Sequence, residues 1–212
     1  MIKKSLLLLC LLFSGLTFAQ SDSLQLQQSE IPKKKRAFQK DFNLRLSYIY
    51  PNGIGDNYIA KANTGNYGLG LKLNFFAVHN IHFGIVFEHL SYGITDPALS
   101  TNAHRTNMNN FSVEFMYQKP VSEKLTLSPK IGIGVNNVTH AGKSKYGITH
   151  ATKLAVGMYA DYKIAPKVEA FLGVEYNYLD LDVETASRYQ SFYSNVSLLN
   201  VALGFKFNFN RR

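Results

Sequence analysis

The sequence predicts an all-β fold, specifically an eight-stranded antiparallel up-and-down transmembrane β-barrel. Three observations lead to this prediction. Charged residues make up only 17% of the 212 residues, below the roughly 25% of an average soluble domain. The chain contains 15 Phe, 13 Tyr and 15 Gly, and its mean hydropathy of −0.11 is too polar for a bundle of membrane helices. Apolar and polar residues alternate with a period of two, as in strands that have one apolar face.

Residues 1–19 are predicted to be a cleaved signal peptide. A short basic start precedes an unbroken apolar run over residues 6–13, and small residues precede a cleavage point between Ala19 and Gln20. The apolar run is too short to cross about 30 Å of hydrocarbon as a helix. Cys10 is the only cysteine and lies inside this segment. We therefore expect an exported mature chain without disulfides, thiol catalysis or cysteine-bound metal.

Residues 20–40 are predicted to form a polar, basic periplasmic tail. Pro32 precedes four consecutive basic residues at positions 33–36. Such a run can contact an acidic polymer or a lipid head group. A solvated tether is the better interpretation, because such runs are common at chain ends. Nucleic acid is not expected as a partner, because the signal peptide directs the protein away from it.

Residues 41–212 are predicted to form the barrel domain. Eight alternating segments are found, most of them near the 9–11 residues that cross a bilayer on a tilt. In chain order they cover residues 42–50, 67–75, 81–88, 111–118, 125–135, 153–162, 168–178 and 199–209. Their apolar faces begin, in the same order, at Phe42, Tyr67, Ile81, Phe111, Leu125, Leu154, Val168 and Leu199.

The connections between these segments also alternate in length. Those after the second, fourth and sixth segments are short and cover residues 78–80, 120–124 and 163–167. Those after the first, third, fifth and seventh are long and polar and cover residues 51–66, 93–109, 136–151 and 180–194. Short periplasmic turns opposite long extracellular loops are typical of outer-membrane barrels. An even number of strands places both chain ends on the side of the short turns.

Periodicity alone does not say which face points outward, since a soluble lipocalin-like barrel has the same alternation with its apolar face inward. Glycine favours the membrane barrel. The strand glycines all lie on the polar face: Gly68, Gly70, Gly84, Gly132, Gly134, Gly157, Gly173 and Gly204. Glycine weakens an exposed strand, whereas a narrow eight-stranded lumen needs small residues beside large ones. The absence of Trp also argues against a lipocalin.

The polar faces of the predicted strands carry ten charged residues. Five are cationic: Arg45, Lys72, Lys130, Lys153 and Lys206. Five are anionic: Glu88, Glu114, Asp161, Glu169 and Glu175. Unpaired buried charge is costly, so this balance predicts a closed, charge-paired network inside the barrel. Together with the inward Met116, Tyr159 and Phe171, it indicates a plugged barrel rather than a diffusion pore.

Few residues point to chemistry. The pairs Gly53/Gly55 and Gly132/Gly134 lack the third glycine of a dinucleotide-binding loop. The six His are dispersed without ligand spacing, so no metal and no cofactor are expected. His89-Leu90-Ser91 puts a His and a Ser on the outward side of one strand, near its upper end.

The segment from Phe42 to Phe209 resembles the small outer-membrane β-barrels of Gram-negative bacteria, namely OmpX-type eight-stranded barrels and the PorT-like barrel domains of Bacteroidetes. Gly204, Phe207 and Phe209 resemble the terminal signal of such barrels, which the barrel-assembly machinery reads. The sequence departs from that signal in having Ala202 where a polar residue is usual, and in extending to Arg212.

This resemblance implies a protein of the cell outer membrane, in contact with outer-membrane lipid and lipopolysaccharide. Its expected role is non-enzymatic, either structural or in surface interaction. An accessory subunit of a secretion or surface machine, as in PorT-like proteins, is the alternative. The His89–Ser91 pair is similar to that of lipid A deacylases, but Tyr92 replaces the family's Asn and Glu114 faces inward. A lipid A-modifying enzyme and a soluble lipocalin-like barrel are therefore less favoured, and no catalytic residue is expected.

Overall fold

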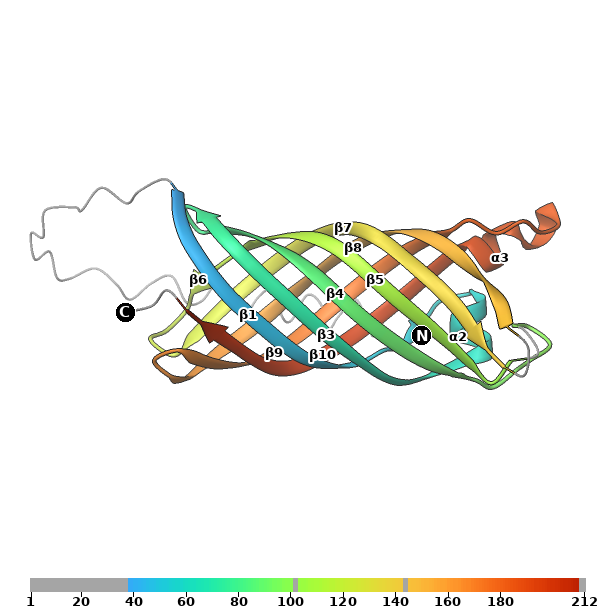
Figure 1. Cartoon of the computed structure of the whole chain (residues 1–212), viewed down its shortest axis with the longest axis horizontal. Coiled ribbons are helices and arrows are strands. Elements are labelled where there is room, and N and C mark those ends of the chain that lie inside the picture. The colour runs from blue at the N-terminus through green and yellow to red at the C-terminus, as the bar shows by residue number, and fades with distance from the viewer. Residues whose placement is uncertain (1–37, 101–102, 143–144, 210–212) are drawn as a thin grey trace, which may run out of the picture. The chain divides into compact units, whose positions relative to one another are not determined.

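The computed structural model of the chain describes residues 38–100, 103–142 and 145–209. Eight long antiparallel strands make up most of the described chain, as Figure 1 shows. They are β1 (Phe38–Tyr50), β3 (Asn63–Val78), β4 (Ile81–Ile94), β5 (Arg105–Tyr117), β7 (Leu125–Ala141), β8 (Lys145–Ala165), β9 (Val168–Leu181) and β10 (Asn195–Asn208).

Each long strand pairs with the next one along the chain, and β1 pairs with β10 to close the sheet. The closing register runs from Asn43 opposite Asn208 to Tyr50 opposite Val201. Two short strands add to this path: β2 (Gly53–Ile54) pairs with β10, and β6 (Lys119–Pro120) pairs with β7. The predicted eight-stranded antiparallel up-and-down barrel is confirmed.

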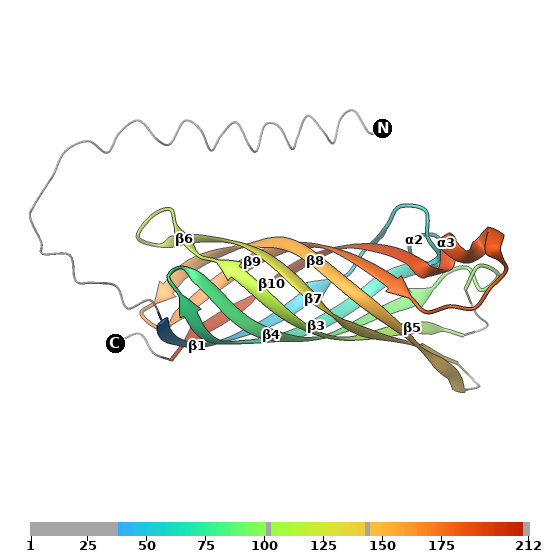
Figure 2. The same ribbon diagram turned by 90° about the horizontal axis from the view of Figure 1, so that it is seen from above.

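The two ends of the barrel differ in their connections. At one end, here called the turn end, lie the short connections at residues 79–80, 118–124 and 166–167. At the other, the loop end, lie the described connecting residues 51–62, 95–100, 103–104, 142 and 182–194. The loop end carries α2 (Tyr58–Ala62), the 3-10 helix η2 (Ser187–Tyr189) and α3 (Gln190–Ser194). Figures 1 and 2 show α2 and α3 at the same end of the barrel.

The strands extend further toward the loop end than the alternation predicted. The prediction of a long loop over residues 136–151 is wrong, because β7 continues to Ala141 and β8 begins at Lys145. Asn137 pairs with His150, and Thr139 with Ile148. Asn137, Thr139 and His150 interrupt the apolar outer face, so the alternation in the sequence stops there, yet backbone pairing continues through these residues.

Several predicted features of the N-terminal region lie outside the described residues. These are the signal peptide, its cleavage point at Ala19 and Gln20, and the basic run at residues 33–36. β1 begins at Phe38, three residues before the predicted start of the barrel domain. Phe38 pairs with Val78 of β3, so the barrel includes the last residues of the segment predicted as a tail.

The apolar face of the sheet points outward. Ile133 is 65% exposed and Leu69 is 57% exposed, whereas the intervening polar positions are buried. The lipocalin-like alternative is therefore wrong, because it requires the apolar face to point inward. Gly204 illustrates how tightly the strands meet. A Cβ atom at this position would overlap the carbonyl oxygen of Leu46 across the closing pair of strands.

Candidate functional site: the barrel interior and its cap

The ten charged residues of the predicted network all face the barrel interior and are 9% exposed or less. Near the turn end, four of them form one ion-paired chain. Nη1 of Arg45 lies 2.5 Å from Oδ1 of Asp161, and its Nη2 lies 2.8 Å from Oδ2. Nζ of Lys206 lies 3.7 Å from Asp161 and 3.0 Å from Glu169. This chain has two cations and two anions, so its net charge is zero.

The other six charges form a second chain closer to the loop end. Lys72 and Lys130 both pair with Glu114, the second at 2.8 Å. Lys130 also pairs with Glu175. Nζ of Lys153 then lies 3.2 Å from Glu175 and 2.7 Å from Glu88. Three lysines alternate with three glutamates in this chain, so it is also neutral.

An aromatic side chain lies between the two ion-paired chains. The Tyr159 ring has the guanidinium carbon of Arg45 4.5 Å from its centroid and Nζ of Lys130 4.4 Å from it. Its hydroxyl oxygen accepts a 2.8 Å hydrogen bond from Lys130. Phe171 packs edge-on against this ring at 5.3 Å, and Met116 is buried in the same cluster. Cation–π contacts of this kind add to the attraction between paired charges.

These side chains leave little open space among them. The cavity beside the second ion-paired chain has a volume of about 20 Å³ and is lined by Lys130, Tyr159, Glu175 and Asn200, among others. Such a volume holds about one water molecule. A continuous water-filled passage through this level of the barrel would require these paired side chains to move.

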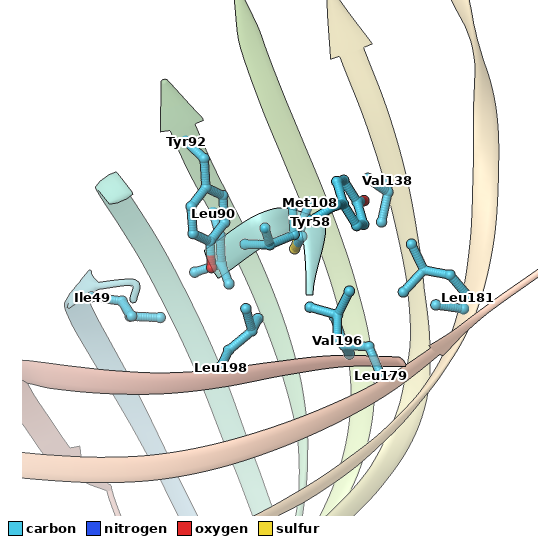
Figure 3. Close-up of a cluster of buried hydrophobic side chains, with 12 residues drawn as sticks. Ile49, Tyr58, Leu90, Tyr92, Met108, Val138, Leu179, Leu181, Val196 and Leu198 are labelled. Atoms are coloured by element: carbon cyan, nitrogen blue, oxygen red, sulfur yellow. The ribbon is translucent and has the colours of Figure 1, made fainter. Parts of the chain in front are cut away.

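Above the charges, the interior of the loop end is apolar. One cluster of buried side chains is contributed by seven of the strands and by α2, and Figure 3 shows most of it. Its strand members are Ile49, Leu90, Tyr92, Met108, Val138, Ala151, Leu179, Leu181, Val196 and Leu198. This layer separates the buried charges from the loops.

The helix α2 caps this apolar layer. Asn57 begins the helix, since its side-chain oxygen accepts a 3.0 Å hydrogen bond from the amide of Ala60. Ile59 is fully buried and Tyr58 almost so. The Tyr58 ring lies 5.7 Å from that of Tyr193 in α3. Burial raises the pKa of the Tyr58 hydroxyl, which stays protonated at neutral pH.

The cap and the apolar layer were not predicted from the sequence. Tyr58 and Ile59 lie in a segment interpreted as a long polar loop, and Val196 and Leu198 precede the predicted last strand. A signal was present, however. Within β4 the apolar positions change face, since Phe87 points outward whereas Leu90 is buried inside.

On the outer face, four polar residues form one row across neighbouring strands at the loop end. His89 of β4 is paired with Asn109, Asn109 with Asn137, and Asn137 with His150 of β8. Nδ1 of His89 lies 2.8 Å from Oδ1 of Asn109, and Nδ1 of His150 lies 2.8 Å from Oδ1 of Asn137. His89 thus bonds to Asn109 rather than to Ser91, which is fully buried.

The residues of the predicted assembly signal lie at the turn end of β10. Phe209 is 53% exposed on the outer face, and Phe207 is half-buried there. Phe207 is paired with Leu44 of β1 and Val168 of β9, so it lies beside the closing pair of strands. The ring of Phe209 contacts that of Phe42 at 5.3 Å.

Two further observations concern the described residues as a whole. Within residues 38–100, 103–142 and 145–209, no three His, Asp or Glu side chains are grouped so that they could hold a metal ion. In the same part of the chain, no helix has the length and apolar character needed to span a membrane.

Comparison with solved structures relates this geometry to known proteins. Neisserial surface protein A superposes with a TM-score of 0.58 at 10% identity, over 79% of this chain and 97% of that one. Ail, the attachment invasion locus protein of Yersinia pestis, superposes with a TM-score of 0.51 at 16% identity, over 81% and 99%. The fold is that of the small outer-membrane β-barrels. No protein-family model matches the sequence, and no curated protein resembles it closely enough to count as a relative. At these identities, the likeness to small outer-membrane barrels concerns the fold alone.

Proposed function

We propose that this protein is an integral, non-enzymatic β-barrel of the bacterial outer membrane with a structural or surface-interaction role. The observation that carries the proposal is the arrangement of polarity. The outward face of a closed barrel is apolar, whereas its charges lie inside and are paired. In water, this arrangement would expose far more contiguous apolar surface than soluble proteins tolerate.

The dimensions of the outward apolar belt fit a bilayer. β1 has 13 residues and β4 has 14, and about 3.3 Å per residue at a tilt near 40° gives a strand height of about 33–35 Å, enough to carry the roughly 25 Å apolar band of an outer-membrane barrel. At the turn end, aromatic rings meet around the barrel: Phe42 contacts Phe75, and Phe83 contacts both Phe76 and Phe115. Aromatic girdles of this kind flank the apolar band of outer-membrane barrels.

The interior supports a barrel closed to diffusion. Two neutral ion-paired chains fill the lumen, and the apolar layer under α2 lies between them and the loops. Function would then reside in the outer surface and the loop end. Two barrels of the same fold are named as a surface protein and as an attachment invasion protein. A surface-interaction role agrees with those names.

Cell fractionation tests the proposed location. We expect the protein in the outer-membrane fraction, resistant to extraction by carbonate or urea. On cold SDS gels it should migrate as a compact band that shifts on boiling, because a closed barrel resists unfolding in cold detergent. Recovery as a soluble protein without detergent would refute the proposal.

Planar bilayer recording tests the closed interior separately. Purified protein should give no stable conductance above background, because the lumen is filled by paired side chains. Reproducible channels that pass small sugars would contradict a closed barrel, although they would leave the proposed membrane location standing.

A further inference from the structure

The outer face of the barrel is hollowed along β10, β1, β3, β4 and β5, strands that lie side by side (Figure 1). This hollow, here called the outer groove, has a volume of about 720 Å³. Its outward side chains are Leu46, Tyr48, Leu69, Leu71, Phe87, His89, Asn109, Leu203 and Phe205.

Strand register arranges these side chains in two rows. The row nearer the turn end joins Phe205 to Leu46, Leu46 to Leu71, and Leu71 to Phe87, so it is entirely apolar. The row nearer the loop end joins Leu203, Tyr48, Leu69, His89 and Asn109, each opposite the next. The outer groove is therefore apolar over most of its length and polar at one corner, which is the pattern of an amphiphile.

The polar corner can donate hydrogen bonds. The bond between His89 and Asn109 uses Nδ1 of the first and Oδ1 of the second. The two N–H groups of the Asn109 amide, and Nε2 of His89 when it is protonated, supply the donors. Tyr48 adds a hydroxyl group in the same row. The Tyr67 ring lies 6.2 Å from the His89 ring and bounds the site toward the loops.

The positions of the acidic residues indicate where along the polar row an anionic ligand would bind. Glu88 is the acidic residue of the groove lining, but its carboxylate is buried and accepts bonds from Asn110 and Lys153 inside the barrel. At the far end of the polar row, His150 instead shares a pocket with Asp180 and Asp182. An anion is therefore favoured at His89 and Asn109 over the His150 end.

We propose that the outer groove binds a membrane lipid with an anionic phosphate head group. The phosphate accepts hydrogen bonds from Asn109 and His89, and an acyl chain lies along Leu46, Leu71 and Phe87. This inference rests on the proposed membrane location, because only a bilayer presents such a lipid to this face. It identifies a specific site on a surface that is otherwise in general contact with lipid.

The absence of Trp from the chain makes the test direct. The Phe87→Trp variant places a single indole in the outer groove, and Leu154→Trp places one on the outer face of β8. The two native side chains are 45% and 47% exposed. Both variants are reconstituted in phosphatidylcholine vesicles that contain increasing fractions of phosphatidylglycerol with brominated acyl chains. Bromine quenches only an indole that the labelled chain touches.

We expect phosphatidylglycerol to quench the Phe87→Trp variant at a lower lipid fraction than the Leu154→Trp variant, by about two- to tenfold, as a net gain of one hydrogen bond would give. Adding His89→Ala and Asn109→Ala should abolish this preference. Asn195→Ala is the matched control. It removes another outward bond at the loop end, from the Tyr178 hydroxyl, and should leave the preference unchanged.

Equal quenching of the two single-Trp variants would overturn the lipid site while leaving the membrane location intact. An equal preference for brominated phosphatidylcholine would also overturn it, because the net negative charge of the head group would then play no part. A preference that survives the double alanine variant would overturn it as well, because His89 and Asn109 would then play no part. Absence of quenching at both positions would instead contradict the membrane location itself.

Discussion

The ion pair between Arg45 and Asp161 allows a direct test of the proposed closed interior. Both side chains are 2% exposed or less, and two hydrogen bonds join them. Asp161→Asn changes the net charge of one ion-paired group of side chains from zero to +1. This group consists of Arg45, Asp161, Lys206 and Glu169. Removing one partner of a buried ion pair costs about 3–5 kcal/mol, because the other charge stays buried without compensation.

The matching variant Arg45→Met gives the same group of four side chains a net charge of −1, and the double variant returns this net charge to zero. We therefore expect the double variant to be more stable than the sum of the single costs predicts. A coupling energy of about 0.5–3 kcal/mol is usual for residues in contact. The surface pair of Lys61 and Asp56, 3.6 Å apart and largely exposed, is the control. Asp56→Asn should change stability little.

The assay is a urea titration of folded protein in lipid vesicles, read as the fraction of compact barrel on cold SDS gels. The result that would refute the reasoning is a cost for Asp161→Asn no larger than that of Asp56→Asn. Strict additivity of Arg45→Met and Asp161→Asn would refute it as well. Either outcome would mean that water reaches these groups, so that the interior is open rather than filled.

Variants at three further positions test other parts of the molecule. Ile59→Ala removes the fully buried side chain of the cap and should lower the free energy of unfolding by about 2–5 kcal/mol in the same urea assay; an unchanged midpoint would show that α2 does not pack there. Phe207→Arg should cost about 0–4 kcal/mol, depending on its depth in the bilayer, and should reduce the amount of compact barrel in membranes. In the same position, Phe207→Cys should react poorly with a water-soluble maleimide but be accessible to a lipid-soluble spin label, and shielding from both would contradict an outward apolar face. Gly204→Val should weaken the pairing of β1 with β10, because its Cβ would overlap the Leu46 carbonyl oxygen; an undiminished compact band would refute this.

Much of the barrel can be predicted because alternate residues of a strand point to opposite faces of the sheet. Once the strand glycines such as Gly204 indicate that the polar face is the inner one, the same alternation assigns the ten charges of the predicted network to the lumen. Arg45 and Asp161 are 116 residues apart in the chain, so their pairing depends on closure of the sheet. The sequence therefore indicates that the charges balance, but not that they separate into two neutral chains.

The loop end was harder to predict because its signals are not periodic. Residues 136–141 of β7 continue as a strand because β5 and β8 supply partners for their backbone groups. The cap depends on Tyr58 and Ile59, which lie in a connection between strands. These two side chains can be buried only because an apolar layer lies beneath them. That layer is assembled from different strands, so no local stretch of sequence shows it.

The position of the apolar residues along single strands explains both the outward apolar belt and the apolar layer inside the loop end. Toward the turn end these residues point outward, and toward the loop end they point inward. In β5, Phe111 points outward and Met108, three residues nearer the loops, is buried inside. In β7 the same change separates Val135 from Val138. An apolar side chain is stable outside the barrel where lipid surrounds it, and inside where water does. Under the proposed function, each change of face marks the depth at which lipid gives way to water. The row from His89 to His150 lies at that boundary, which is where a lipid head group would be found.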